Sequence, residues 1–172
     1  TSMALAIAEA VCGSTDALIR LDMAEYNNAG SSNRLLGADP GYVGHDSETA
    51  LVRGLMAHHA GVLLLDEFDK AHHEVQQLFL GAFDEGRIRD AKGRSHSLSN
   101  VTVVATSNAG GQVAREVGFG KALSRNAGTN GKIPKELLAF FSAELLNRFD
   151  EVVIFNPLEE MHLREIFHSQ LL

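Results

Sequence analysis

The most constraining feature of the sequence is the segment Gly61 to Lys70, which reads Gly-Val-Leu-Leu-Leu-Asp-Glu-Phe-Asp-Lys. Its four consecutive aliphatic residues, Val62 to Leu65, lack the alternation of a strand with one wet face. Such a run predicts a strand that is buried on both faces in the middle of a parallel sheet. It is too short to span a membrane. The run therefore predicts a fold of the α/β class.

Two adjacent carboxylates, Asp66 and Glu67, follow this strand directly. Ionised groups at the edge of a core are costly unless a cation or hydrogen bonds satisfy them, and ligands bind at the carboxyl ends of parallel strands. Strand geometry points the two side chains to opposite sides, so Asp66 can hold Mg²⁺ while Glu67 activates a water, as in a Walker B element. A strand followed by a solvated turn is the alternative, and both readings stay open on these residues alone.

Composition limits the class of protein. The 172 residues allow about one domain, and a hydrophobic fraction of 45% is enough for a core. The formal charge of −7 argues against a nucleic-acid-binding surface. Cys12 is the only cysteine, which excludes an internal disulfide and a CxxC metal site. Because no segment resembles a signal peptide or a membrane span, we expect a cytoplasmic protein.

Periodicity predicts further elements around the central strand. We expect helices at 1–11, 47–58, from 72, at 137–146 and from 159, strands at 17–23, 101–106 and 152–155, and a β-hairpin at 87–98. The buried face of the first helix would be Met3, Ala4, Ile7, Ala10 and Val11. Asp46 or Ser47 would cap the helix at 47–58. The stretch 27–44 reads as a polar loop, and 110–132 as a long loop of a length that is usually functional or mobile.

Histidines on both sides of the acidic pair raise a metal hydrolase as an alternative. His58-His59 precedes the strand, however, and the carboxylates follow it. Several residues at roughly 3.3 Å each exceed a shared coordination sphere. His72 and His73 are instead expected to begin the next helix.

The strand expected at 101–106 also ends in polar residues, Ser107 and Asn108. These residues should lie at the same sheet edge as Asp66 and Glu67. An asparagine there can orient a water or a phosphate oxygen. A turn-forming asparagine before Gly110 is the alternative.

Taken in register, these motifs resemble the AAA+ ATPase module of Clp-type protein unfoldases (ClpA, ClpB and ClpC), in their second nucleotide-binding ring. The segments that match are Leu21 to Tyr26, Arg34 to Gly44, Leu63 to Ala71, Gly86-Arg87, Lys92 to Arg94, Thr106 to Asn108 and Glu144 to Glu151. The resemblance implies a P-loop NTPase-like three-layer αβα fold with a parallel sheet. It also implies a large α/β subdomain over 1–158, with the phosphate-binding loop truncated before Thr1. Residues 159–172 would begin a helix that leads to a small C-terminal subdomain.

The same resemblance implies a role for each site residue, with ATP and Mg²⁺ as cofactors. Thr1 matches the last residue of the Walker A loop, which supplies a hydroxyl to Mg²⁺. Asp66 would help to hold the metal, and Glu67 would polarise the attacking water. Asn108 matches the sensor-1 position that orients this water, and Arg148 matches the arginine finger that reaches into the neighbouring subunit's site.

The resemblance also implies partners. Tyr42 and Val43 match a pore loop that grips a translocating polypeptide, so we expect a homo-hexamer that acts on unfolded or tagged proteins. Val117, Gly118 and Phe119 resemble the tripeptide that docks protease-linked members on a ClpP-type peptidase, although a hydrophobe tucked on the loop surface is the alternative. Neither nucleic acid nor a membrane is expected as a partner.

The expected function is ATP hydrolysis coupled to threading proteins through a hexameric pore, either for a peptidase or for disaggregation. One alternative is a nucleic-acid-directed AAA+ motor or clamp loader, in which Arg87, Arg89 and Arg94 would contact phosphates. Another is that the chain is inactive as an isolated monomer. Two departures from the family pattern, His45 in place of an aromatic and Ser142 in place of an arginine, imply differences in substrate grip and phosphate sensing.

Overall fold

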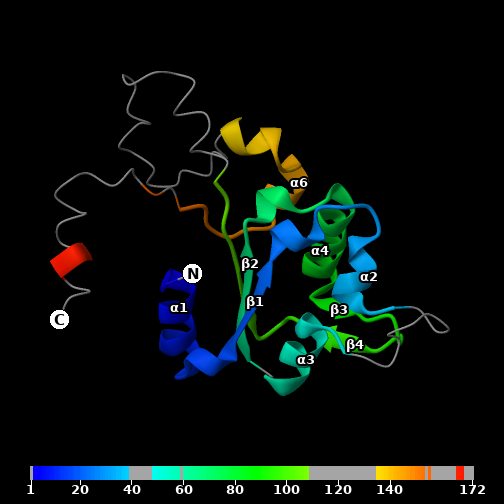
Figure 1. The fold of residues 1–172 in the computed structure, drawn as a ribbon, viewed down its shortest axis with the longest axis horizontal. Coiled ribbons are helices and arrows are strands. Elements are labelled where there is room, and N and C mark those ends of the chain that lie inside the picture. Colours follow the sequence, from blue (N-terminus) through cyan, green and yellow to red (C-terminus); the bar gives the residue numbers. More distant parts are fainter. Residues whose placement is uncertain are drawn as a thin grey trace.

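Three parallel strands form the centre of the molecule (Figure 1). The computed structural model describes residues 2–38, 48–58, 60–108, 135–153, 155 and 166–168. The strands are β1 (Leu18–Asp22), β2 (Gly61–Asp66) and β5 (Val101–Ala105), in the order β1-β2-β5. Asp22 is level with Asp66, and Leu65 is level with Ala105. All three strands therefore end at one edge of the sheet.

The central strand β2 is buried on both faces, as its sequence predicts. The side chains of Val62 to Leu65 are all 0% exposed. Because side chains alternate along a strand, Leu63 and Leu65 face the main hydrophobic core, while Val62 and Leu64 face the opposite layer.

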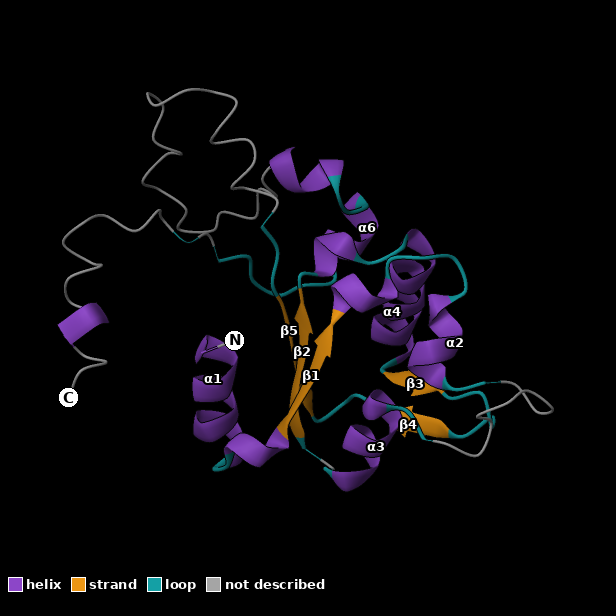
Figure 2. Ribbon diagram, in the orientation of Figure 1, coloured by secondary structure: helices purple, strands orange, loops and turns teal. Residues whose placement is uncertain are grey.

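Helices cover both faces of this sheet (Figure 2). On one face lies α1 (Ser2–Cys12), which packs through the buried side chains of Ala4 and Ala8. On the other face, α3 (Ala50–Ala57) and α4 (His73–Glu85) contribute to the main core. This arrangement confirms the expected three-layer αβα fold.

Short elements connect these layers. They are η1 (Thr15–Ala17), η2 (Met23–Tyr26), α2 (Ser31–Leu36), η3 (Phe68–Lys70), β3 (Arg87–Arg89), β4 (Ser95–Ser97), η4 (Lys135–Ala139) and α6 (Ala143–Leu146). The rings of Phe68, Phe79 and Phe141 meet at centroid separations of 5.8 and 5.5 Å. This aromatic cluster fastens η3, directly after β2, to α4 and to the segment before α6.

The antiparallel β3–β4 hairpin is confirmed, with Ile88 paired to His96. Gly93 has a φ of 77° in its turn, a left-handed conformation that glycine adopts without a steric penalty. In the described part of the chain, no helix is long and apolar enough to cross a membrane.

Two helix predictions need correction, one at its start and one in its interior, and one predicted loop contains a helix. Helix α3 begins at Ala50, and its cap is Thr49, whose Oγ1 accepts a hydrogen bond from Val52 N at 3.2 Å. The predicted helix at 137–146 is interrupted, because Ser142 Oγ accepts from Leu145 N at 3.2 Å and starts α6 afresh. Helix α2 lies in a stretch that the sequence predicts to be a loop.

Two other predictions are wrong. Residues 151–153 and 155 are not in a strand, and the side chains of Val153 and Phe155 are 61% and 69% exposed. An apolar run does not by itself provide the paired backbone that defines a strand. The buried face of α1 also differs from the prediction, because Met3 and Val11 are exposed and the small Ala8 lies against the sheet.

Candidate functional site

The site is built at the edge where the three strands end, and Asp66 is its first member. Asp66 is the last residue of β2, and its side chain is 15% exposed. Its Oδ1 accepts a hydrogen bond from Thr106 Oγ1 at 2.7 Å, and its Oδ2 lies 2.7 Å from Arg20 Nη2. Strand β1 and the residue directly after β5 thus each supply a side chain that holds this carboxylate.

These contacts keep Asp66 ionised. The hydrogen bond from Thr106 lowers the pKa of Asp66 below its ordinary value, burial opposes the change, and Arg20 lowers the pKa further. An ionised carboxylate at this edge can bind a cation.

Glu67 follows Asp66 in a left-handed backbone conformation, with φ 55° and ψ 48°. Among the described residues it is the only non-glycine residue with a positive φ. The strand ends at Asp66, so the turn, and not strand alternation, sets the direction of the Glu67 side chain. Its Oε1 accepts a hydrogen bond from Asn108 Nδ2 at 3.5 Å. The turn therefore aims this carboxylate toward the end of the neighbouring strand.

Thr106 joins the two halves of the site. Its hydroxyl donates to Asp66 and accepts from Glu67 N at 3.0 Å. Its backbone N donates to Leu65 O at 3.0 Å, and its carbonyl accepts from Phe68 N at 2.8 Å. Through these four bonds, one residue fixes the whole turn from the end of β2 into η3.

The structure therefore brings together three of the predicted site residues, Asp66, Glu67 and Asn108. Sequence reasoning missed Thr106 and Arg20. Thr106 had a detectable signal, because a hydroxyl at the end of a buried strand next to a buried carboxylate is a natural hydrogen-bond donor to it. The sequence signal for Arg20 was weaker, because the sequence of β1 alone does not reveal the strand register that places Arg20 near Asp66.

The amino-terminal end of α1 points toward the same edge of the sheet (Figures 1 and 2). The first backbone N–H groups of a helix have no partner within the helix and favour anions. Thr1 itself lies outside the described residues.

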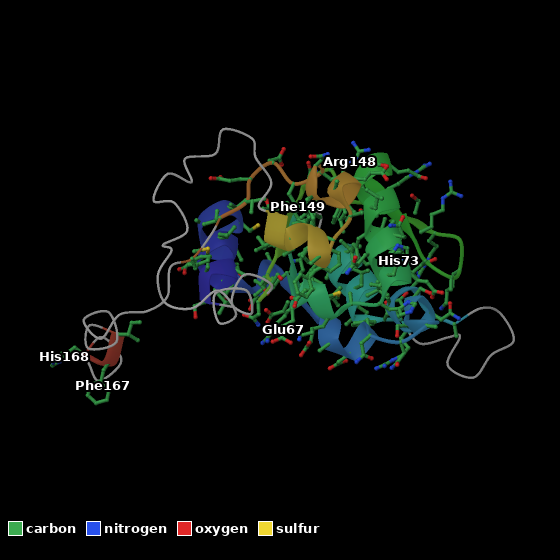
Figure 3. All side chains as sticks on the ribbon, turned by 90° about the horizontal axis from the view of Figure 1, so that it is seen from above. Glu67, His73, Arg148, Phe149, Phe167 and His168 are labelled. Atoms are coloured by element: carbon green, nitrogen blue, oxygen red, sulfur yellow. The ribbon has the colours of Figure 1, made fainter. Side chains whose placement is uncertain are left out.

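Arg148 lies elsewhere. It follows α6, and its Nε is 2.5 Å from Asp84 Oδ1 on α4, with 44% of its side chain exposed. The next residue, Phe149, packs edge-on against Phe83 at 5.8 Å. Looking onto the end of the molecule where the strands finish, Figure 3 shows Arg148 and Glu67 on opposite sides. Arg148 thus points neither into the core nor at the carboxylate pair of its own chain.

The remaining predicted site residues lie outside the described part of the chain. These are Tyr42, Val43, Val117, Gly118 and Phe119.

The two histidines that follow the acidic pair do not join it. His72 Nδ1 accepts a hydrogen bond from Glu74 N at 3.3 Å and so caps α4. His73 lies apart from Glu67 in Figure 3. These positions do not favour a metal hydrolase.

Two of the three arginines in the β3–β4 hairpin are already paired with carboxylates. Arg87 Nε is 2.9 Å from Glu85 Oε2, and Arg94 contacts Asp90 at 2.7 Å and Glu48 at 2.9 Å. These pairs reduce the positive charge that the hairpin offers to a nucleic-acid phosphate.

The oxygen atoms of Asp66 fit a magnesium ion. Mg²⁺ prefers oxygen ligands and is often held by one or two carboxylates together with waters, and Asp66 supplies one such carboxylate. Arg20 contacts one oxygen of Asp66, and its side chain is 51% exposed, so a cation can replace it without unpacking the core.

Comparisons with known sequences agree with this geometry. Residues 1–152 match the family model described as AAA domain (Cdc48 subfamily). The chain is 38% identical over 172 residues to the ATP-dependent Clp protease ATP-binding subunit ClpE of Streptococcus pneumoniae, which covers 99% of this chain and 22% of that protein. It is 37% identical over 171 residues to the negative regulator of genetic competence ClpC/MecB of Bacillus subtilis, covering 96% and 21%.

A third relative is the chaperone protein ClpB of Rhodopirellula baltica, at 38% identity over 174 residues, covering 99% of this chain and 19% of the relative. The chain therefore spans about a fifth of the length of the curated relatives it matches.

A solved structure shares the fold. It is a closed-state cryo-EM reconstruction of Hsp104 with ATPγS and FITC casein, with a TM-score of 0.81 and 31% sequence identity, covering 99% of this chain and 29% of that one. The carboxylate pair at the strand ends, the shared fold and the match over 1–152 lead to one conclusion: the chain belongs to the AAA domain (Cdc48 subfamily) family and is a Clp-type AAA+ module.

Proposed function

We propose that this chain binds ATP with Mg²⁺ and hydrolyses it, as the motor module of a larger Clp-type unfoldase. The observation that carries the proposal is the cluster at the strand ends, where Thr106 holds Asp66 and the turn at Glu67, and Asn108 contacts the Glu67 side chain. The similarity to ClpE, an ATP-binding subunit of an ATP-dependent protease, supports the same activity.

In this mechanism Asp66 would help to hold Mg²⁺, with the Thr1 hydroxyl as a second ligand, and the metal would neutralise phosphate charge. Glu67 would accept a hydrogen bond from the attacking water and orient it toward the γ-phosphate. Asn108, which contacts the Glu67 side chain, would fix the direction of that carboxylate. Most of the catalysis in phosphoryl transfer is positioning and charge stabilisation, which suits a site built from fixed hydrogen bonds.

Arg148 would complete the site of a neighbouring subunit as an arginine finger. Its partial exposure and its separation from its own Glu67 support action in trans. An arginine finger can contribute roughly 10³ to 10⁵ in rate, so hydrolysis would depend on assembly, for which we propose a homo-hexamer.

We further propose the division into a large subdomain over 1–158 and the start of a helix over 159–172. Tyr42 and Val43 would contact unfolded or tagged protein substrates, and Val117 to Phe119 would dock a ClpP-type peptidase. The cytoplasm is the proposed location.

The decisive experiment replaces Glu67 by Gln in the full-length protein. The amide keeps the size of the side chain but is a poor base, so ATP affinity should stay within about twofold while turnover falls by about 10² or more. ATP binding is measured by calorimetry and turnover by phosphate release. Unchanged turnover would refute the assignment, and salt-sensitive binding of DNA or RNA would favour the nucleic-acid-directed motor instead.

A further inference from the structure

Arg148 is held by a carboxylate from another element of the fold. It follows α6, and its Nε lies 2.5 Å from Oδ1 of Asp84 in the last turn of α4. Helix α4 itself does not account for an acidic residue there, because the helix dipole disfavours negative charge in the last turn, and this turn contains no basic residue. In the described part of the chain, the cation that offsets the charge of Asp84 is therefore Arg148.

A separate contact fixes the backbone next to Arg148. The ring of Phe149 packs edge-on against Phe83 of α4 at 5.8 Å, and Phe83 packs against Phe79 of the same helix at 5.9 Å. This aromatic contact does not involve Asp84. Replacing Asp84 should therefore free the side chain of Arg148 and leave its backbone in place.

The ion pair uses the inner nitrogen of the Arg148 guanidinium group. A guanidinium has five N–H donors, one on Nε and four on Nη1 and Nη2. A phosphate is bound best by two parallel hydrogen bonds from such a group. A carboxylate at Nε fixes the plane of the guanidinium and leaves the donors on Nη1 and Nη2 for a second acceptor. Because 44% of the Arg148 side chain is exposed, that acceptor can belong to another chain.

We propose that Asp84 is a positioning residue that fixes the direction of the Arg148 guanidinium for contact with the γ-phosphate in the neighbouring subunit. This inference rests on the proposed role of Arg148 as an arginine finger. An exposed arginine has many rotamers, and a contact that limits them beforehand reduces the entropy lost when the phosphate is bound. Asp84 acts only through Arg148, and it does so in the chain that donates the arginine.

The first test compares ATP turnover of the full-length protein with that of its Asp84→Ala variant. We expect kcat to fall about fivefold, the upper end of the effect of an exposed ion pair, while the KM for ATP stays within about twofold. This combination is the one expected for a contact that is made only in the transition state. An unchanged kcat would contradict the inference.

The matched control is Glu85→Ala. It removes the same charge from the next residue of α4 and breaks an ion pair with Arg87, whose side chain is 46% exposed beside the 58% exposed Glu85. That ion pair does not include Arg148. Turnover of the control should equal that of the parent protein. An equal loss in Asp84→Ala and Glu85→Ala would show a general effect of charge at the end of α4 and would overturn the inference.

Mixed assemblies show in which chain Asp84 acts. A Glu67→Gln chain can donate Arg148, and an Arg148→Ala chain can supply the intact Glu67 that receives it. Adding Asp84→Ala to the Glu67→Gln chain should lower turnover of the mixture about fivefold, because that chain donates the arginine. Adding Asp84→Ala to the Arg148→Ala chain should change nothing. A residue that only supports the fold would cause equal losses in both placements, and this result would refute the positioning role.

Arg148→Ala separates this inference from the proposed function. If Arg148→Ala loses turnover and Asp84→Ala does not, the positioning role is wrong and the proposed function stands. If Arg148→Ala keeps full turnover, the proposed arginine finger fails, and the inference fails with it. The double variant should turn over ATP no more slowly than Arg148→Ala alone, and additive losses would contradict the inference.

Discussion

At the scale of single residues, the hydroxyl of Thr106 holds both acidic residues of the candidate site. It is a donor to Asp66 and an acceptor for Glu67 N at the same time, so it fixes one carboxylate through its oxygen and the other through its backbone. A hydrogen-bonded partner of a metal ligand is typically worth 10- to 100-fold in metal affinity or activity.

Thr106→Val should therefore lower ATP turnover about 10- to 100-fold, because valine keeps the shape and removes both hydrogen bonds. It should also raise the pKa of Asp66, since the bond from Thr106 is the largest cause of its lowering. Turnover as a function of pH and of Mg²⁺ concentration measures both effects. Thr106→Ser restores the hydroxyl and should recover most of the activity, whereas equal losses in the two variants would assign the effect to packing.

Asp90 gives a prediction about stability and pH. Burial raises the pKa of Asp90, but hydrogen bonds from His96 and Arg94 outweigh it and lower the pKa from 3.8 to about 2. A carboxylate with a depressed folded-state pKa stabilises the fold above its unfolded pKa, and this contribution is lost as pH falls toward 2. The contribution at neutral pH is about 2 kcal/mol.

The stability gap between the parent chain and Asp90→Asn should accordingly narrow as pH is lowered from 5 to 2. Urea unfolding followed by circular dichroism at several pH values measures it. Other carboxylates titrate equally in both proteins and cancel in the comparison. A gap that is constant with pH would contradict the role of the ionised carboxylate.

At the scale of elements, the fit of α3 against β1 depends on a glycine. A Cβ at Gly54 would lie 2.7 Å from Ile19 Cγ1 and 2.9 Å from both Cδ1 and Cγ2 of the same side chain. Since Ile19 is buried, it cannot move away freely. Gly54→Ala should destabilise the fold by about 1–3 kcal/mol, the usual cost of overpacking a core.

Gly81→Ala is the matched control for this helix contact. Gly81 lies inside α4, where an added Cβ would meet nothing within 4 Å. This substitution should stabilise the fold by about 0.5–1 kcal/mol through helix propensity alone. Chemical unfolding of both variants measures the difference, and a similar effect of the two alanines would show that the α3–β1 contact is looser than described.

The elements also show what the sequence can and cannot predict. The run Val62 to Leu65 predicts the central strand correctly, because four adjacent aliphatic residues indicate a strand whose two faces are both buried. Val153 and Phe155 look like part of a strand but are exposed, because pairing depends on distant backbone. For the same reason the contact of Arg20 with Asp66 could not be read from either segment. The polar residues that follow the two buried strands did predict that Asp66, Glu67 and Asn108 lie at one edge of the sheet, and Thr106 carried a signal of the same kind.

At the scale of the whole molecule, Arg148 and Glu67 lie on opposite sides of one chain. If Arg148 acts in trans, mixing two inactive variants should restore activity. A Glu67→Gln chain keeps an intact arginine, and an Arg148→Ala chain keeps an intact carboxylate. In a random mixture, about a quarter of the interfaces combine both intact parts, so turnover should recover to about that fraction of the parent value. No recovery would place the action of Arg148 within its own chain.

The left-handed backbone conformation of Glu67 lowers the stability of the fold at a residue that the proposed ATP hydrolysis requires. A side chain in that conformation costs about 1 kcal/mol relative to glycine. Selection for folding alone would favour a glycine at this position, and only a demand for turnover would keep the glutamate there. Variants selected only for thermal stability are therefore expected to replace Glu67 by glycine. They should fold more stably and lose the proposed ATP hydrolysis.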